Sequence, residues 1–498
     1  MRKLLFLSVT CLMATGTLAA GPETNATAPA TQPAGPEPTK LTLRPSAATQ
    51  PASRHSLLPD PGDQTPGDAV TLYLLARRFW PDQKTTDEVL SPENGRFDYL
   101  DSIDKFPEAY AKRLLEAYAE TLTYLDLGAR RREAHWDTGW RERGFAGPSP
   151  FAYLDDLRHA ANLLNFRGRY QILHGDWVAA HYTLQTEFSM AQHVGTEPLL
   201  IHALVESGFA QIALARTVED WIGHGDSPNL YWALTDLPHP FVRLQPIVAG
   251  EQMGLRYYKP RPWQALRGEL PAQQWPEVVR EMIGMLQERN PHYKRDPTQI
   301  DVEARKLIES TYSRAKQDLL AGGMPERNVA AMSADEVVGT YLCHQYNAIS
   351  DELWRVWAFP FPQAQEQMLR AWNALAPDKP PASDNPLIQA NLVDFDFGRG
   401  RPDYQIPSVL RMRYEVERPD RHTALLRTIE ALRDYAARHG GQPPQHLEQM
   451  TDLPLPVDPM TGKPFAYRLE GRSATLDAPP PPGRSLYSGW QYELTFAR

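Results

Sequence analysis

Two acidic residues, Glu187 and Glu206, lie within stretches of otherwise apolar residues that have helical spacing. Carboxyl groups that face an internal groove have raised pKa values, which suit a general acid. A glycan-cleaving enzyme needs only two such groups, and they can be distant in sequence. A polar helix flank, or a buried ion pair with an arginine, would give the same pattern. Glu187 and Glu206 are therefore the candidate catalytic residues of one hypothesis, an envelope glycan-cleaving hydrolase.

Other residue types that could do chemistry lack the spacing that the chemistry needs. Five histidines fall in one helical block but form no HExxH or HxxxH pair, which would set two metal ligands one turn apart: His159, His174, His181, His193 and His202. Cys343 and His344 are neighbours, and adjacent helical residues point about 100° apart, which disfavours a nucleophile and base pair. We expect Cys343 to be a buried apolar residue, and we predict no cofactor and no metal site.

Helices would position these residues. Between Asp155 and Ile222 the apolar spacing is interrupted at Gly175-Asp176, where the aspartate can cap the next helix, and at Thr196 with Pro198, which we expect to cap a third. Three helices in hairpins follow. The fragment at 175–180 resembles the start of the second helix of a tetratricopeptide repeat.

Similar signals predict further helices along the chain. They lie at 108–134, 227–234, 271–289, 297–320, 333–356 and 363–376. Ser333 begins a capping box, and Ser227-Pro228 has the form of a helix start. No strand is predicted before residue 400. Residues 68–400 are therefore expected to form an all-α domain of stacked helical hairpins with a solenoid-like body.

Composition narrows the class of protein. The chain has 498 residues, of which 42% are hydrophobic and 10% aromatic, as in a globular protein. Its net charge is -9, and no long basic run offsets it. Because this charge repels phosphate backbones, we predict no nucleic-acid partner.

The first residues predict export. Arg2 and Lys3 precede an apolar run and then the small residues Ala19 and Ala20, the pattern of a signal peptide over 1–20. The mature chain would have no transmembrane helix, because no later apolar run is long enough. Residues 21–67 are rich in Pro, Ala and Thr and predict a disordered linker. We expect an exported bacterial protein of the periplasm or cell envelope.

Residues 401–498 change in character and predict a small α+β module. Helices are expected at 408–417 and 423–438, with Pro419 as a break between them and Gly440-Gly441 as the end. Short runs of β-forming residues at 465–469, 473–476 and 490–496 predict an antiparallel sheet.

The order of residues in this module resembles the soluble domain of type II secretion major pseudopilins. The matching residues include Asp458, Pro459, Gly462, Pro464, Phe465 and Tyr467, preceded by Tyr435. The resemblance implies that Asp458, Pro459, Gly462 and Pro464 form a turn and that Tyr435, Phe465 and Tyr467 belong to the core. These implied roles are structural.

Three functional hypotheses follow. The leading one is a non-enzymatic interaction or scaffold protein with a protein partner in the cell envelope, because capped helices are many and no catalytic motif is complete. The alternatives are the glycan-cleaving hydrolase and a component of a type II secretion or pilus-like assembly. The sequence leaves the oligomeric state open.

Overall fold

The structure is a computed structural model that describes residues 37–48, 56–82, 103–136, 151–289, 297–375, 408–481 and 489–497. Within these ranges the protein is mainly helical and carries a small sheet near its C-terminal end, as the sequence predicts. The expected signal peptide and the first part of the expected linker lie outside the described residues. Across the described ranges, no helix combines the length and apolarity that a membrane crossing requires.

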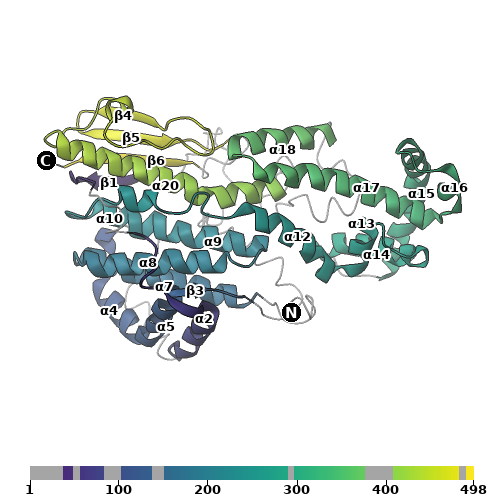
Figure 1. Cartoon of the computed structure of the whole chain (residues 1–498), viewed down its shortest axis with the longest axis horizontal. Coiled ribbons are helices and arrows are strands. Elements are labelled where there is room, and N and C mark those ends of the chain that lie inside the picture. Colours follow the sequence, from purple (N-terminus) through teal and green to yellow (C-terminus); the bar gives the residue numbers. More distant parts are fainter. Residues whose placement is uncertain are drawn as a thin grey trace, which may run out of the picture.

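The body of the molecule begins with helices that pack against one another in layers (Figure 1). They are α2 (Ala69–Ala76), α4 (Glu108–Ala117), α5 (Ala119–Ala129), α7 (Tyr153–Leu173), α8 (Trp177–Val194) and α9 (Leu200–Ile212). Helices α7, α8 and α9 confirm the three predicted helices. Gly175 has a φ of 67°, and Asp176 accepts a hydrogen bond from the backbone N of Ala179, so the predicted turn and cap are also confirmed.

The prediction of one helix over 108–134 is wrong. The chain forms α4 and α5, and then β3 (Arg131–Glu133), which pairs in parallel with β2 (Thr65–Asp68). The guanidinium of Arg130 lies over the ring of Tyr182, 3.5 Å from its centroid, and donates to Thr186 Oγ1. These contacts with α8 fix the end of α5 and override the helical spacing. The prediction that no strand occurs before residue 400 is therefore also wrong.

Two predicted caps differ from the structure. Thr196 donates its hydroxyl hydrogen to the carbonyl oxygen of Ala134 at 2.7 Å, and α9 begins four residues later without a side-chain cap. The next short helix, α11 (Tyr231–Thr235), begins after Asn229, whose Oδ1 accepts from the backbone N of Tyr231. Ser227, expected to start that helix, accepts instead from the side chain of Arg433. In each case the hydroxyl group expected to cap a helix forms a hydrogen bond with a residue that is distant in sequence instead.

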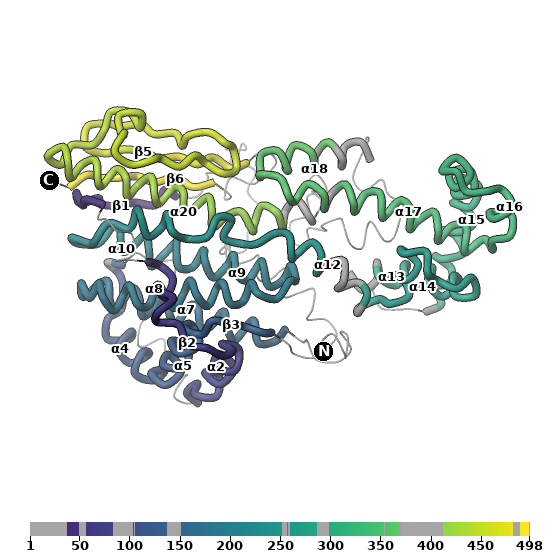
Figure 2. Tube along the Cα trace, viewed as in Figure 1, coloured from purple at the N-terminus to yellow at the C-terminus, as the bar shows by residue number. Residues whose placement is uncertain are grey.

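A group of helices with its own hydrophobic core extends away from the body (Figures 1 and 2). It comprises α13 (Pro260–Leu266), α14 (Trp275–Arg289), α15 (Pro297–Ala321), α16 (Glu326–Ala331) and α17 (Ala334–Arg355). We call it the helical arm. Ser333 caps α17 by accepting from the backbone N of Glu336, as predicted. Helix α12 (Leu244–Tyr258) leads into the arm, and α17 returns from it toward α18 (Phe361–Leu375).

Helix α20 (Ser408–Arg438) is continuous, with Pro419 inside it. The break predicted at Pro419 is therefore wrong. The helix lies between the sheet and helices α9 and α11 of the body, and its residues are buried both before and after Pro419 (Figure 1). Packing on both sides offsets the hydrogen bond that proline removes. Gly440 and Gly441, with φ of 59° and 79°, end the helix as predicted.

The sheet contains the three predicted strands and one that was not predicted. Strands β4 (Ala466–Glu470), β5 (Ser473–Ala478) and β6 (Trp490–Phe496) are antiparallel, and β1 (Thr39–Leu43) pairs in parallel with β6. Residues 39–43 thus correct the expectation of a linker over 21–67 and of a purely antiparallel sheet. Leu41 and Leu43 are buried and alternate with exposed residues, a two-residue period that the Pro-rich composition conceals.

The turn before β4 has the predicted form. Asp458 donates its backbone N–H to Lys463 O, and Gly462 has a φ of 68°. Phe465 is buried, whereas Tyr435 and Tyr467 are partly buried against the core. The local turn is confirmed, and the likeness to pseudopilins stays a prediction.

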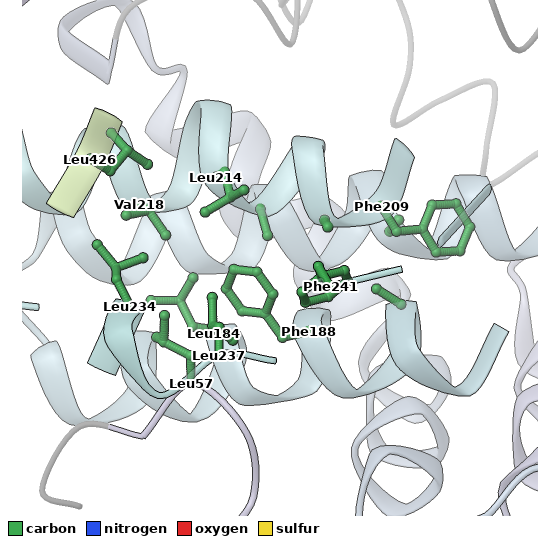
Figure 3. Close-up of a cluster of buried hydrophobic side chains, with 14 of the residues drawn as sticks. Leu57, Leu184, Phe188, Phe209, Leu214, Val218, Leu234, Leu237, Phe241 and Leu426 are labelled. Atoms are coloured by element: carbon green, nitrogen blue, oxygen red, sulfur yellow. The ribbon is translucent and has the colours of Figure 1, made fainter. Parts of the chain in front are cut away.

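One hydrophobic core joins the helical body to the C-terminal module. Figure 3 shows Leu184 and Phe188 of α8 facing Leu214 and Val218, with Leu426 of α20 at the edge of the cluster. The body and the module are therefore packed as one unit.

Candidate functional site

Glu187, the first candidate acid, lies on the buried face of α8. Its side chain is 4% exposed, and Oε1 accepts a hydrogen bond of 3.1 Å from Thr217 Oγ1. Thr217 in turn accepts from Asn165 Nδ2 at 2.9 Å. Oε2 of Glu187 has no hydrogen-bond partner within the described part of the chain. Glu187 belongs to a buried polar chain that crosses from α8 to α7.

Glu206, the second candidate acid, lies on α9 and is also 4% exposed. Its carboxyl group sits against Gly195, the residue that ends α8: a methyl group at Gly195 would lie 2.0 Å from Glu206 Oε2. The C-terminal end of a helix carries partial negative charge, so this place favours the neutral carboxyl over the carboxylate.

Burial raises the pKa of both acids. It raises the pKa of Glu187 to about 8 and that of Glu206 well above the ordinary value. Neutral carboxyl groups are what a general acid requires. Both groups, however, are enclosed by packed helices, and among the described residues they make no hydrogen bond to each other. Their pKa values therefore reflect burial in the core, which keeps substrate away.

The five candidate metal ligands have five different surroundings. In the described ranges, no group of three or more His, Cys, Asp or Glu residues is placed to hold a metal. The contacts are His159 with the ring of Trp80, His174 with Glu108, His181 with the carbonyl of Ser56, His193 with the hydroxyl of Tyr73, and His202 with the hydroxyl of Tyr153. The structure does not bring these histidines together. Cys343 is 1% exposed, and burial raises the pKa of its thiol to about 12.

The polar groups that the structure does bring together surround a π-helical segment, Ala213–Val218, which follows α9 and continues into α10 (Glu219–Gly223). One extra residue per turn shifts the side chains that follow. Thr217 then faces Glu187, Glu219 faces α20, and Asp220 accepts from Arg169 Nε at 2.5 Å. The segment distributes three polar side chains to three different neighbours.

His422 of α20 is the centre of a buried polar cluster with Glu219 and Tyr492. Tyr492 of β6 donates its hydroxyl hydrogen to Glu219 Oε1 at 2.6 Å, and its oxygen lies 2.7 Å from Nε2 of His422. All three side chains are almost fully buried. Burial, reinforced by the charge of Glu219, raises the pKa of Tyr492 well above its ordinary value. Helix α20, the body and the sheet therefore meet at one polar cluster.

Helix α20 makes a second buried contact with the loop before β4. Arg421 donates from Nε and Nη2 to the two carboxylate oxygens of Asp458 at 3.0 and 2.7 Å, and Nη2 also reaches the carbonyl of Pro479. Arg421 is fully buried and Asp458 is 2% exposed. A two-point pair of this kind fixes both position and orientation.

A third contact lies further along α20. Arg433 Nη1 donates to Glu430 Oε2 at 2.8 Å, and Nη2 donates to the carbonyl of Ser227. The other carboxylate oxygen of Glu430 accepts from the backbone N of Leu230. The side chains of Arg433 and Glu430 are both fully buried. The pair connects α20 to the segment that precedes α11.

These three contacts form what we call the α20 clamp. Its charged groups are paired and enclosed, so removing one partner of a pair would leave the other charge buried without compensation. The clamp sets the register of the C-terminal module on the helical body.

No protein-family model, curated protein or solved structure matches this chain.

The buried contacts of the clamp are not predicted from the sequence, which assigns Asp458 only to the turn before β4. One signal was available: Arg418 to His422 is a run of charged residues and one proline inside a segment that is otherwise amphipathic. A dense charge run within a helix that is also rich in leucine indicates paired charges in the interior. The partners Glu219 and Tyr492 had no such signal, because they lie far away in sequence.

Proposed function

We propose that the protein is an exported, non-enzymatic scaffold of the bacterial cell envelope that binds a protein partner through the helical arm. The observation that supports this most is the arm itself. It has a separate hydrophobic core and extends away from the body that anchors it (Figure 2). Helices that project in this way present much surface for their length.

The arm has the features of a firm interaction surface. Trp275 of α14 lies against Gly339 of α17 so closely that a methyl group there would be 2.4 Å from its ring. Ala315 and Leu319 hold one face of α15 in the core, while Arg305 and Arg314 are exposed on different sides of the helix. An exposed polar face on a well-packed helix suits a partner that binds reversibly.

Photocrosslinking tests this proposal in cells. A photoreactive residue replaces Val302 on α15, which is 42% exposed, and in a matched control replaces Val178 of the body, which is 82% exposed. We expect a discrete crosslinked partner from position 302 and none from 178. The purified partner should bind the wild-type protein and lose at least tenfold affinity for Arg314→Glu. Crosslinking from 178 alone, or unchanged binding by Arg314→Glu, would contradict the assignment to the arm.

Localisation is tested separately. Export predicts that the mature protein begins after Ala19 or Ala20 and is recovered from the periplasmic or envelope fraction. Mass spectrometry of the N-terminal peptide checks the first point. Recovery of the protein with an intact N-terminus from the cytoplasmic fraction would contradict the proposed location in the cell envelope.

The hydrolase is the second candidate, and the raised pKa of Glu187 is the observation that favours it. Its test is the hydrolysis of cell-wall glycan by the wild-type protein and by Glu187→Gln. Activity in the wild type that disappears in the variant would replace the scaffold proposal. Equal activity, or none in either, would exclude Glu187 as the acid.

A further inference from the structure

The N-terminal segment that contains β1 crosses the C-terminal module as an extended strap. We call residues 39–48 the N-terminal strap. It pairs with β6 in a five-residue parallel register, from Thr39 opposite Tyr492 to Leu43 opposite Phe496. Beyond β1, the strap runs along α20 toward Asn229 and Asp434. It is the edge strand of the sheet (Figure 1).

The body and module recognise the strap mainly through its backbone. Arg433 Nε donates to the carbonyl of Arg44 at 3.0 Å, and Asn229 Nδ2 donates to the carbonyl of Ser46 at 2.8 Å. The backbone N of Ala48 donates to Asp434 Oδ1 at 2.8 Å. Backbone recognition at an open sheet edge is how many proteins bind an extended peptide.

Two leucines supply the side-chain anchors. Leu43 is fully buried and Leu41 is 8% exposed, while Lys40 and Thr42, on either side of Leu41, face outward. Gly223, the last residue of α10, leaves room for Leu41: a methyl group there would be 3.2 Å from Leu41 Cδ2. Alternate anchors on a pleated strand give the groove its specificity.

The groups that hold the strap are positioned by other parts of the protein. Arg433 is fixed by Glu430 and Ser227, and Asp434 accepts from Arg438 Nε at 2.8 Å. Asn229 Oδ1 accepts from the backbone N of Tyr231. Arg433, Asn229 and Asp434 are each 5% exposed or less. The groove therefore keeps its receptor groups in place without help from the strap, which is the condition for binding a strap supplied from elsewhere.

We propose that this groove is a strand-exchange site that accepts the N-terminal strap of a second copy of the chain. Every backbone bond and leucine contact made within one chain is available at the same register between two. The groove can hold the strap of its own chain or that of a second copy. Which one it holds depends on the protein concentration relative to the effective concentration of the attached strap, which is about millimolar for a short connection. Exchange links the N-terminal strap of one copy to the sheet of the next. It does not involve the helical arm, so it is independent of the proposed partner.

Disulfide trapping between full-length chains tests the exchange. Both native cysteines, Cys11 and Cys343, are first replaced by alanine. One chain then carries Thr42→Cys and the other Thr495→Cys, two exposed positions that lie opposite each other in β1 and β6. The control mixture pairs Thr42→Cys with Arg468→Cys, which is exposed but lies on β4 at the other edge of the sheet.

Oxidation of the first mixture should give a heterodimer on non-reducing gels, at least fivefold above the control mixture and increasing with protein concentration. Adding Leu43→Asp to the Thr42→Cys chain should abolish it, because a charge would enter the buried leucine site. A single chain with both cysteines should close internally.

Internal closure without a heterodimer above the control would overturn the exchange. A second double variant, Lys40→Cys with Glu493→Cys, uses another opposed pair. If neither double variant closes, the register fails, and the proposal fails with it.

Discussion

Replacing Glu187 by Gln should make the protein more stable at neutral pH, and the gain should depend on pH. Glutamine retains an oxygen that accepts from Thr217 and fills nearly the same volume, but it does not ionise. The substitution therefore isolates the free energy of keeping a carboxyl group neutral in the core.

The sign follows from the two pKa values. In the folded protein the pKa of Glu187 is about 8, against an ordinary 4.5. Between these values the unfolded chain ionises while the folded chain stays protonated, so rising pH stabilises the unfolded state. The wild type therefore loses stability from about pH 4.5 up to about pH 8, where the loss levels off. At about 1.4 kcal/mol per pH unit, the loss at pH 7 reaches about 3 kcal/mol.

Equilibrium unfolding in guanidinium, followed by tryptophan fluorescence, measures this effect at pH 4, 5.5 and 7. The difference between Glu187→Gln and wild type should grow by about 3 kcal/mol from pH 4 to pH 7. Glu120→Gln on the exposed face of α5 is the matched control and should show no such growth. A difference that stays constant with pH, or that favours the wild type at pH 7, would refute the neutral buried carboxyl.

Two further predictions concern packing. Arg421→Met leaves Asp458 buried without its partner and should cost about 3–5 kcal/mol, whereas the double variant Arg421→Met/Asp458→Leu should recover most of it in thermal unfolding. A single variant as stable as the wild type would show that the pair is not buried. Gly195→Ala places a methyl group against the carboxyl of Glu206 and should cost about 1–3 kcal/mol. In a Glu206→Ala background that cost should nearly vanish, and equal costs in both backgrounds would contradict the contact.

Local signals predicted the parts of the fold that depend on neighbouring residues. Gly175 with Asp176 marks a turn and cap, Ser333 caps α17, and the three C-terminal strands follow from runs of β-forming residues. These features need only the geometry of a few adjacent residues. They can therefore be predicted from a single sequence.

The remaining features depend on partners that are distant in sequence. Strand β1 exists because β6 offers an edge, and Pro419 is tolerated because packing surrounds α20. The π-helical segment changes which residues face α20, so helical spacing alone would not direct Glu219 toward His422. The apolar residues around Glu187 and Glu206 mark both acids as unusual, but sequence alone does not predict how deeply they are buried.

The pairing of β1 with β6 sets a condition on the order of folding. Residues 39–43 leave the ribosome long before their partners at 492–496 are made. Until then the leucines of β1 have no place to bury, and closing so long a loop is slow. The sheet edge is therefore completed only after residues 492–496 have been synthesised. Chains truncated near the C-terminus would keep that strand unpaired, and quality-control proteases would find an exposed, extended segment there.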